Sequence, residues 1–296
     1  MARHCAQGDQ VRYLTRKPIS GGIAGASAFV GDLSSPLADL QEFARGADVL
    51  YHCAAELQDV ALMHQTNVLG TANLITAAGG RIGRWVQLSS TGVYGRNVPG
   101  DVFEDTAVNP SNAYEISKEA ADNVLREAHL PSVIVRPSNV YGTDMPNQSL
   151  YQLIKTIDKG LFFFIGPPGA VANYVHVENV VDALMLCATA ALPANGRTYI
   201  VSDHRTLEEL VHVIAVSLGR AAPRLRLPEP LIRAVATIAR RMPGFPLSPS
   251  RVDALTSRTV YRTDRITAEL GYDNRVSLEA GMAELVHHWK GRPAHG

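Results

Sequence analysis

A tyrosine and a lysine four residues apart, Tyr114 and Lys118, are the residues of this chain best suited to chemistry. Residues at this spacing lie on one face of a helix, so the phenol and the ammonium can come close together. A nearby ammonium favours the phenolate and would lower the pKa of Tyr114 below its ordinary value of about 10. The pair can therefore act as a general acid/base, although the same spacing is also found on solvated helix faces.

A second segment lies upstream, at residues 85–95, and reads Trp-Val-Gln-Leu-Ser-Ser-Thr-Gly-Val-Tyr-Gly. Its first half is mostly apolar and predicts a buried strand, and hydroxyl side chains follow where that strand ends. Open α/β sheets bind ligands at the carboxyl ends of their strands, so these hydroxyls are placed to meet a ligand. Together the two segments make Tyr114 and Lys118 candidate catalytic residues.

Ordered segments along almost the whole chain resemble the extended short-chain dehydrogenase/reductase family, in its epimerase/dehydratase branch. Besides the two segments above, the matching stretches are Gly31-Asp32-Leu33, residues 48–55, 67–73 and 136–142, and the Tyr-Val-His-Val run at 174–177. The resemblance implies a doubly wound, Rossmann-type α/β fold with a parallel sheet. It also implies an NAD(P)-binding domain at 1–202, with 143–172 contributing to the substrate lobe, and a smaller, mostly helical substrate lobe at 203–296.

The same resemblance assigns roles to individual side chains. Ser90 would hydrogen-bond the reacting oxygen, Tyr114 would be the general acid/base, and Lys118 would hold the nicotinamide ribose. Asn139 would face the substrate together with Ser90. Further cofactor contacts are expected from Asp32 on the adenine side, and from Leu33, Cys53, Ala54, Ala55, Asn67 and Ser138. His176 lies in an apolar strand pattern and is interpreted as structural, and no residues have the spacing of a metal site.

The elements that must position these residues alternate between strand and helix up to about residue 200. Strands are predicted at 11–15, 48–54, 85–89, 132–137 and 197–202, and helices at 37–45, 60–78, 112–129, 148–159 and 179–190. Thr206 and Glu209 form a capping box that opens a helix closed by Gly219. Proline-punctuated linkers are expected at 223–230 and 243–249, and Ser277 is expected to cap a last helix that reaches Trp289.

The glycine-rich loop that normally follows the first strand of this fold is missing from the sequence. Residues 1–10 resemble the end of the first helix running into the second strand, and Gly21-Gly-Ile-Ala-Gly25 has the wrong position and spacing to replace the loop. We expect that about 20 to 25 residues precede the given start, because the lost strand would be central in the sheet. The 296-residue chain alone is then expected to be unstable and to bind cofactor poorly. The alternative is a genuinely shortened protein.

The end of the strand at 11–15 bears on the choice of cofactor. An acid at this position binds the ribose hydroxyls of NAD, whereas a nearby arginine accommodates the 2′-phosphate of NADP. Here Thr15 stands at the acid position and is followed by Arg16 and Lys17. The sequence therefore favours NADP, with Arg16 as the phosphate ligand, unless the two cations are only solvated loop charges.

Three functions remain open. The first is a nucleotide-sugar epimerase or dehydratase, but the Arg-Asp pair that such enzymes carry before the Tyr-Val-His-Val strand is replaced by Ala172-Asn173. Arg251, Arg258 or Arg262 could supply another cation. The second is an NADP-dependent reductase or dehydrogenase of an apolar alcohol or ketone, resembling the 3β-hydroxysteroid dehydrogenase and dihydroflavonol reductase branch, which the apolar run at 162–165 favours. The third is a non-catalytic, shortened member of the fold.

Composition excludes several other classes of protein. A formal net charge of zero over 296 residues gives no sign of a nucleic-acid partner. No apolar run reaches about 18 residues, so no membrane span is expected, and 231–239, followed by Arg240 and Arg241, is interpreted as a packed helix rather than a membrane-surface one. Cys53 and Cys187 are expected to be reduced core thiols, which suits the cytoplasm. A homodimer through the helices at 60–78 and 112–129 is implied by the family.

Overall fold

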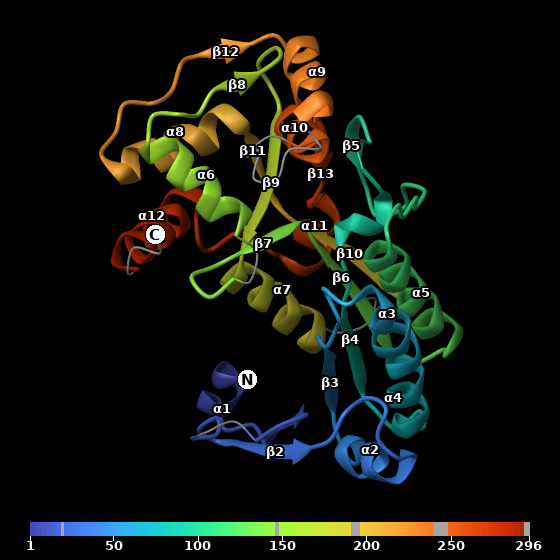
Figure 1. The fold of residues 1–296 in the computed structure, drawn as a ribbon. Helices are drawn as coiled ribbons and strands as arrows, with labels where there is room; N and C mark the ends of the chain where they lie inside the picture. Colours follow the sequence, from blue (N-terminus) through green and yellow to red (C-terminus); the bar gives the residue numbers. More distant parts are fainter. Residues whose placement is uncertain (19–20, 97, 146–147, 191–195, 240–247, 293–296) are drawn as a thin grey trace. The chain divides into compact units, whose positions relative to one another are not determined.

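The structure, a computed structural model, describes residues 1–18, 21–96, 98–145, 148–190, 196–239 and 248–292 (Figure 1). The chain divides into two compact units that are interleaved along the sequence. Unit 1 comprises 1–93, 110–135 and 187–198, and unit 2 comprises 94–109, 136–186 and 199–296. Two of the boundaries between the units fall inside strands of the sheet. The division into a cofactor domain and a substrate domain at residue 202 stays a prediction.

Unit 1 alternates strands and helices, as the sequence predicts. Its elements are α1 (Ala2–Ala6), β1 (Val11–Thr15), β2 (Ala26–Val30), α2 (Leu37–Ala44), β3 (Val49–His52), α3 (Val60–Met63), η1 (His64–Leu69), α4 (Gly70–Ala78), β4 (Arg84–Leu88), η2 (Thr91–Tyr94) and α5 (Ala113–Glu127). Strand β6 (Ser132–Pro137) begins in this unit, and β10 (Arg197–Val201) also crosses the boundary. Every residue of β6 is buried, as expected for a parallel strand that is covered on both faces.

The strands of unit 1 form two separate parallel ladders. One ladder pairs β1 with β2, and the other has the order β10-β6-β4-β3. In the part of the chain that the structure describes, no ladder joins β1 to β3. The sheet is thus interrupted where a doubly wound order would place its first strand. Strand β2 was not predicted, because its sequence, Ala-Ser-Ala-Phe-Val, has only two large apolar residues.

The predicted helix over 60–78 is confirmed as one continuous helical segment with a π-helical turn, η1, between α3 and α4. The Asp59 carboxylate caps it by accepting from the Ala61 N–H at 3.0 Å, and Gly79 ends it in the left-handed conformation. Gly70 allows this helix to approach the turn after β2, since a Cβ there would lie 2.8 Å from the Leu33 Cβ. The glycine of the Asn-Val-Leu-Gly run therefore has a packing role.

Unit 2 contains smaller sheets and most of the later helices. Its strands are β5 (Gly100–Val102), β7 (Asn139–Tyr141), β8 (Phe164–Ile165), β9 (Val171–His176), β11 (Asp203–Thr206), β12 (Arg226–Leu227) and β13 (Thr259–Tyr261). Its helices are α6 (Ser149–Asp158), α7 (Val177–Thr189), α8 (Leu207–Leu218), α9 (Glu229–Ala239), α10 (Pro249–Thr256), α11 (Asp264–Leu270) and α12 (Leu278–Gly291). The apolar faces of α6, α8 and α12 share one core.

Local signals in the second half of the chain were predicted well. The Thr206–Glu209 capping box, the left-handed Gly219 and the Ser277 cap of α12 are all confirmed. The expected linker at 223–230 differs, because it holds β12, which pairs with β8. The linker expected at 243–249 lies mostly outside the described residues. Among the described helices, none is long and apolar enough to cross a membrane.

Cys53 corrects one sequence expectation. The prediction of a core thiol holds for Cys187, which is buried, but Cys53 is exposed. Strand β3 stops at His52, one residue before Cys53, and Cys53 lies in the loop that follows.

His52 ties the β3 strand to the helix layer. Its ring is 3 % exposed, packs edge-on against Trp85, and bonds through Nε2 to the Thr71 hydroxyl at 2.8 Å. The Thr71 hydroxyl donates to the Asn67 carbonyl at 2.6 Å, so the histidine must donate from Nε2 and is neutral. Burial, helped by the positive charge of Lys118, lowers the pKa of His52 to about 3.

We predict that this histidine makes stability depend on pH. Its folded pKa lies below the unfolded value of about 6.5, so the unfolded state takes up the proton first and stability falls as pH drops below 6.5. Between pH 7 and pH 5 the loss is about 2 kcal/mol, at about 1.4 kcal/mol per pH unit. Urea unfolding of His52→Gln should lack this part of the pH dependence, with exposed His204→Gln as control. An unchanged pH slope in His52→Gln would contradict the assignment.

Candidate active site

Two predicted cofactor contacts, Arg16 and Asp32, and a third charged residue, Glu56, lie after the ends of strands β1, β2 and β3. Arg16 follows β1, Asp32 follows β2, and Glu56 follows β3. Hydrogen bonds are the main reason that the pKa values of both carboxyl groups lie below their ordinary values, from Ser34 to Asp32 and from the Gln58 and Asp59 N–H groups to Glu56. The positive charge of Arg16 adds a smaller lowering to both, which places the guanidinium near each of them. The residues that follow these strands therefore form one local cluster of charges.

The Asp32 carboxylate is held by the turn that follows it. It accepts from the Ser34 N–H at 2.7 Å and from the Ser34 hydroxyl, and these bonds are the main reason that its pKa lies below the ordinary value. The Asp32 N–H in turn donates to the Ser35 hydroxyl at 2.8 Å. Leu33 is different, because its side chain is buried against Gly70. A cofactor contact from Leu33 would have to come from its main chain.

Asn67 anchors the loop after β3. Its side-chain oxygen accepts from the Glu56 N–H at 2.6 Å, and its Nδ2 donates to the Glu56 carbonyl at 3.0 Å and to the Ser117 hydroxyl at 2.9 Å. The buried amide is therefore fully engaged within the protein. Asn67 joins the loop at 53–57, where Cys53, Ala54 and Ala55 were predicted to line the cofactor, to helix α5. Its role here is to position that loop.

Ser90 and Tyr114 are in direct contact. Burial raises the pKa of Tyr114, the side-chain interaction with Ser90 lowers it by less, and the charge of Asp122 also raises it. The net pKa of the phenol is above its ordinary value, so Tyr114 is protonated at neutral pH. The Ser90 oxygen also accepts from the Gly92 N–H at 3.0 Å, and a Cβ at residue 92 would come within 3.1 Å of Glu115. Glycine at this position lets the serine turn lie against α5.

Lys118 corrects the electrostatic expectation. Its Nζ donates to the Leu88 carbonyl at 2.6 Å, at the end of β4, and the side chain is 3 % exposed. Burial lowers its own pKa, while the charges of Asp122 and Cys53 oppose that shift. The charge of Lys118 does not lower the pKa of Tyr114, which lies above its ordinary value. The expectation that Lys118 lowers this pKa is therefore wrong. The ammonium instead binds the strand that carries Ser90.

Asp122 is a part of the site that sequence reasoning missed. It follows Lys118 by four residues on α5, is fully buried, and accepts from the Ser89 hydroxyl at 2.8 Å. Tyr114, Lys118 and Asp122 thus repeat every four residues along one helix face, a pattern that was visible in the sequence. The carboxylate supplies the negative charge that a buried ammonium needs.

The remaining predicted residues lie in unit 2. Ser138 is 8 % exposed, and its hydroxyl has no hydrogen-bond partner among the described residues. Asn139, the next residue, is exposed. His176 is buried, accepts from the Glu178 N–H through Nδ1 at 3.3 Å, and faces Glu284 at 3.6 Å. Burial keeps its pKa below the ordinary value, which agrees with a structural histidine.

Two of these residues, Ser138 in unit 2 and Lys118 in unit 1, each have a polar group of the kind that binds a nicotinamide cofactor. A buried hydroxyl without a partner at Ser138 needs an acceptor or donor that the described residues do not supply. The Lys118 ammonium has three donors and uses one on the Leu88 carbonyl, which leaves two N–H groups for other acceptors such as hydroxyls. No group of three or more metal-ligating side chains is found in the described ranges.

Comparison with known proteins places this site in a family. Residues 3–202 match the NAD dependent epimerase/dehydratase family. Short-chain dehydrogenase/reductase family 42E member 1 of Bos taurus is 29% identical over 90% of this chain and 78% of its own length. The 3beta-hydroxysteroid-dehydrogenase/decarboxylase isoform 1 of Arabidopsis thaliana is 26% identical over 90% of this chain and 69% of its own. An Escherichia coli O157:H7 relative, N-acetyl-alpha-D-glucosaminyl-diphospho-ditrans,octacis-undecaprenol 4-epimerase, is 28% identical over 68% and 64%.

Solved structures show the same fold. UDP-glucuronic acid 4-epimerase from Bacillus cereus, in complex with NAD, aligns over 97% of this chain and 93% of its own with a TM-score of 0.73 and 16% identity. RMD from Pseudomonas aeruginosa, complexed with NADPH, aligns over 96% and 100% with a TM-score of 0.66 and 18% identity. The Rossmann-type α/β class predicted from the sequence is thus confirmed. The chain belongs to the NAD dependent epimerase/dehydratase family of enzymes.

Proposed function

We propose that the protein is an NAD(P)-dependent oxidoreductase in which Tyr114 exchanges a proton with a substrate hydroxyl or carbonyl oxygen. The observation that carries the proposal is that Lys118, one turn after Tyr114 on α5, is bound to the end of the strand that leads to Ser90, and that Ser90 interacts with the Tyr114 phenol. When bound, the nicotinamide would give or accept the hydride. The protein supplies the proton and the orientation of the reacting groups.

The protonation states indicate how these residues would act. A protonated Tyr114 can donate to the oxygen of a ketone as that oxygen gains negative charge, and the Ser90 hydroxyl can hydrogen-bond the same oxygen. In the oxidation direction Tyr114 has to be deprotonated, which requires its pKa to fall. A cation brought near the phenol would cause that fall. The raised pKa of Tyr114 therefore favours the general-acid role in the described state.

The substrate class favoured by the side chains is an apolar alcohol or ketone. Asn173 cannot replace the missing phosphate-binding arginine, because its Nδ2 donates to the Thr259 carbonyl at 2.8 Å and its oxygen accepts from the Tyr261 N–H at 3.4 Å. Of the proposed substitute cations, Arg262 is paired with Asp264, and Arg258 donates to the Pro168 carbonyl. Two relatives align over 90% of this chain, and one of them is named a 3beta-hydroxysteroid-dehydrogenase/decarboxylase, which supports the same substrate class.

A sugar substrate is the second candidate, as first expected from the sequence. The supporting observation is the Escherichia coli relative, whose name describes a 4-epimerase acting on a sugar joined through diphosphate to a lipid. Arg251 is the cation that we propose for such a substrate: burial raises the pKa of Tyr174, on the strand that carries Ala172 and Asn173, and the charge of Arg251 opposes that shift, so Arg251 lies near this strand. The cofactor in that case would be reduced and reoxidised within one turnover.

Two finer properties complete the proposal. We infer a preference for NADP, because Arg16 follows β1 where a 2′-phosphate would lie. The Thr15 hydroxyl, at the position of the acid that binds NAD, donates to the Lys17 carbonyl in the same loop.

We also infer a cytoplasmic homodimer that uses the helices at 60–78 and 113–127. Exposed apolar side chains on both helices support the dimer: Val60, Leu62, Leu69 and Ile116. Three free cysteines support a reducing compartment.

We predict that Tyr114→Phe lowers kcat by about 10²- to 10⁴-fold, because it removes the transferable proton and leaves the ring in place. NADPH binding, followed by fluorescence titration, should change little in this variant. Tyr13→Phe makes the same change on a buried tyrosine of β1 and is the control. A Tyr114→Phe protein with normal turnover would contradict the assignment, and absence of both cofactor binding and turnover in the wild type would support the non-catalytic alternative.

A second prediction separates the two substrate classes. With a steroid-like ketone and NADPH, we expect steady loss of absorbance at 340 nm that depends on protein concentration. With a UDP-sugar or a lipid-diphosphate sugar, we expect no interconversion by chromatography, since Asn173 is already hydrogen-bonded. Sugar interconversion without net change at 340 nm would overturn the apolar proposal, and its loss in Arg251→Gln would then identify the phosphate ligand.

A further inference from the structure

Asp9, His4 and Tyr51 form a hydrogen-bonded chain in unit 1 that the predicted active site does not use. The Asp9 Oδ2 and the His4 Nδ1 lie 2.6 Å apart, and the His4 Nε2 lies 2.8 Å from the Tyr51 hydroxyl. His4 belongs to α1, Asp9 to the loop after it, and Tyr51 to β3. A carboxylate, an imidazole and a hydroxyl are thereby joined in the order in which hydrolases join an orienting acid, a base and a nucleophile.

The carboxylate of Asp9 fixes which nitrogen of the His4 ring carries the proton. An ionised carboxylate can only accept a hydrogen bond, so the neutral ring donates to Asp9 from Nδ1. Its Nε2 then has a lone pair and accepts from the Tyr51 O–H. His4 is therefore placed to take the proton of the phenol, and Asp9 is placed to hold the ring while it does so.

Burial makes any reaction of the Tyr51 phenol depend on such a base. It raises the pKa of Tyr51 to about 12, and the charges of Cys53, Asp9 and Cys187 raise it as well. The phenol therefore keeps its proton at neutral pH, and it becomes a nucleophile only when a base removes that proton as the new bond forms. His4 is a base within hydrogen-bond distance of the phenol.

The hydrogen-bonded chain is open to solvent and lies apart from the Tyr114 site. Tyr51 is partly exposed, and the side chains of His4 and Asp9 are 20 % and 54 % exposed. Successive residues of a strand point to opposite faces of the sheet, so Tyr51 faces away from the helix layer on which His52 packs. A small ester can therefore reach the phenol from solvent without entering the predicted active site.

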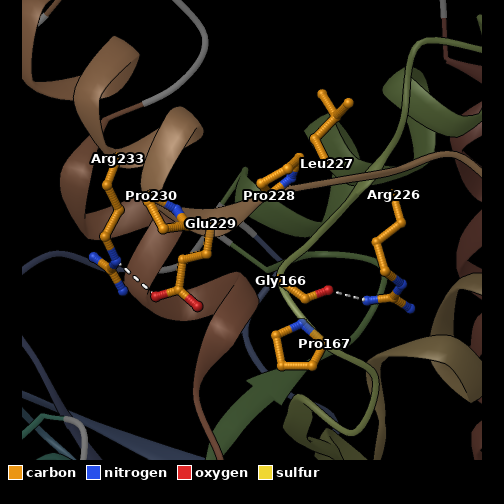
Figure 2. A pocket seen from close by; sticks show the side chains of 8 residues that line it. All are labelled: Gly166, Pro167, Arg226, Leu227, Pro228, Glu229, Pro230 and Arg233. Carbon is orange, nitrogen blue, oxygen red and sulfur yellow. Dashed lines mark hydrogen bonds and ion pairs between the residues drawn. The ribbon is translucent and has the colours of Figure 1, made fainter.

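The charged groups around a cavity in unit 2 are paired with one another. Figure 2 shows this cavity, of about 710 Å³, beside the start of α9, where Arg233 forms ion pairs with Glu229 and Asp253, each at 2.7 Å. None of the described residues that line it is a histidine, a cysteine or a residue with a hydroxyl side chain. Ile232 and Ala236 pack into a core, which confirms the packed helix expected from the sequence, and an apolar stripe on another side of α9 is exposed. These residues stabilise unit 2, whereas the side chains at α1 join a base to a hydroxyl.

We propose that Tyr51 is a second nucleophile of this protein, which accepts acyl groups from activated esters with His4 as its general base and Asp9 as the group that orients His4. The Tyr51 oxygen forms a bond to the ester carbonyl carbon, and His4 takes the phenol proton. The bond from that carbon to the leaving alcohol then breaks, and the proton passes from His4 to the leaving oxygen. Water attacks the acyl-tyrosine in the same way, releases the acid and restores the phenol. The reaction uses no nucleotide cofactor, so it does not depend on the proposed oxidoreductase activity.

Reaction of the full chain with p-nitrophenyl acetate, in the absence of cofactor, tests this proposal. We expect release of p-nitrophenol together with acetylation of Tyr51, located by peptide mass spectrometry. His4→Gln keeps an amide that can donate and accept but cannot act as a base, and it should slow the acetylation of Tyr51 by about 10²- to 10⁴-fold. Asp9→Asn should also slow it, because the ring loses the carboxylate that fixes its tautomer. His204→Gln, at an exposed histidine, is the matched control and should react like the wild type.

Circular dichroism verifies that each variant keeps the fold, and Asp9→Asn replaces His4→Gln as the decisive variant if the latter does not fold. Equal acetylation of Tyr51 in the wild type and His4→Gln would overturn the proposal, because the hydrogen bonds would then only tether α1 to β3. Acetyl groups found in the wild type on amines alone would overturn it too. Release of p-nitrophenol that persists in Tyr51→Phe and is lost in His4→Gln would show that His4 attacks the ester itself, and would contradict the role of Tyr51.

Discussion

The burial of the Lys118 ammonium is the constraint on which the site depends. A charge with 3 % exposure is costly unless hydrogen bonds and an opposite charge replace the water it has lost. The Leu88 carbonyl supplies the hydrogen bond and Asp122 supplies the charge, so α5 can pack in only one register against the end of β4. That register brings Tyr114 to Ser90. Ser89 completes the arrangement because it bonds Asp122 from the same strand end.

Hydrogen bonds from the Asn67 side chain fix the loop after β3. Asn67 bonds both backbone groups of Glu56 and also Ser117 of α5, and its own carbonyl accepts from Thr71, which bonds His52. One amide side chain therefore links β3, the loop behind it and the helix that carries Tyr114. Hydrogen bonds between buried polar groups hold the helices and strands of the site together, which gives the proton-transfer groups a defined geometry.

Patterns of spacing and order were enough to predict the fold class, most of the strands and the position of Tyr114 and Lys118 on one helix. The direction of the Tyr114 pKa could not be predicted, because it depends on how much water the fold removes and on which acceptor the lysine chooses. Cys53 is exposed because strand β3 ends at His52, although the apolar residues Cys53, Ala54 and Ala55 continue the sequence pattern beyond it. For α9 the sequence predicted a packed helix, but periodicity alone could not show that an apolar stripe remains outside. Strand β2 was missed because its composition is weakly apolar.

The central claim is that Lys118 is bound to the strand end, and that Tyr114 keeps its proton in the protein free of ligands. A ¹³C NMR titration of ring-labelled tyrosine, with Tyr114→Phe used to assign the signal, measures that proton directly. We predict that the Tyr114 resonance does not titrate below its ordinary pKa of about 10. A titration centred well below pH 10 in the free protein, and shifted upward in Lys118→Met, would show that the ammonium acts on the phenol and would contradict the account.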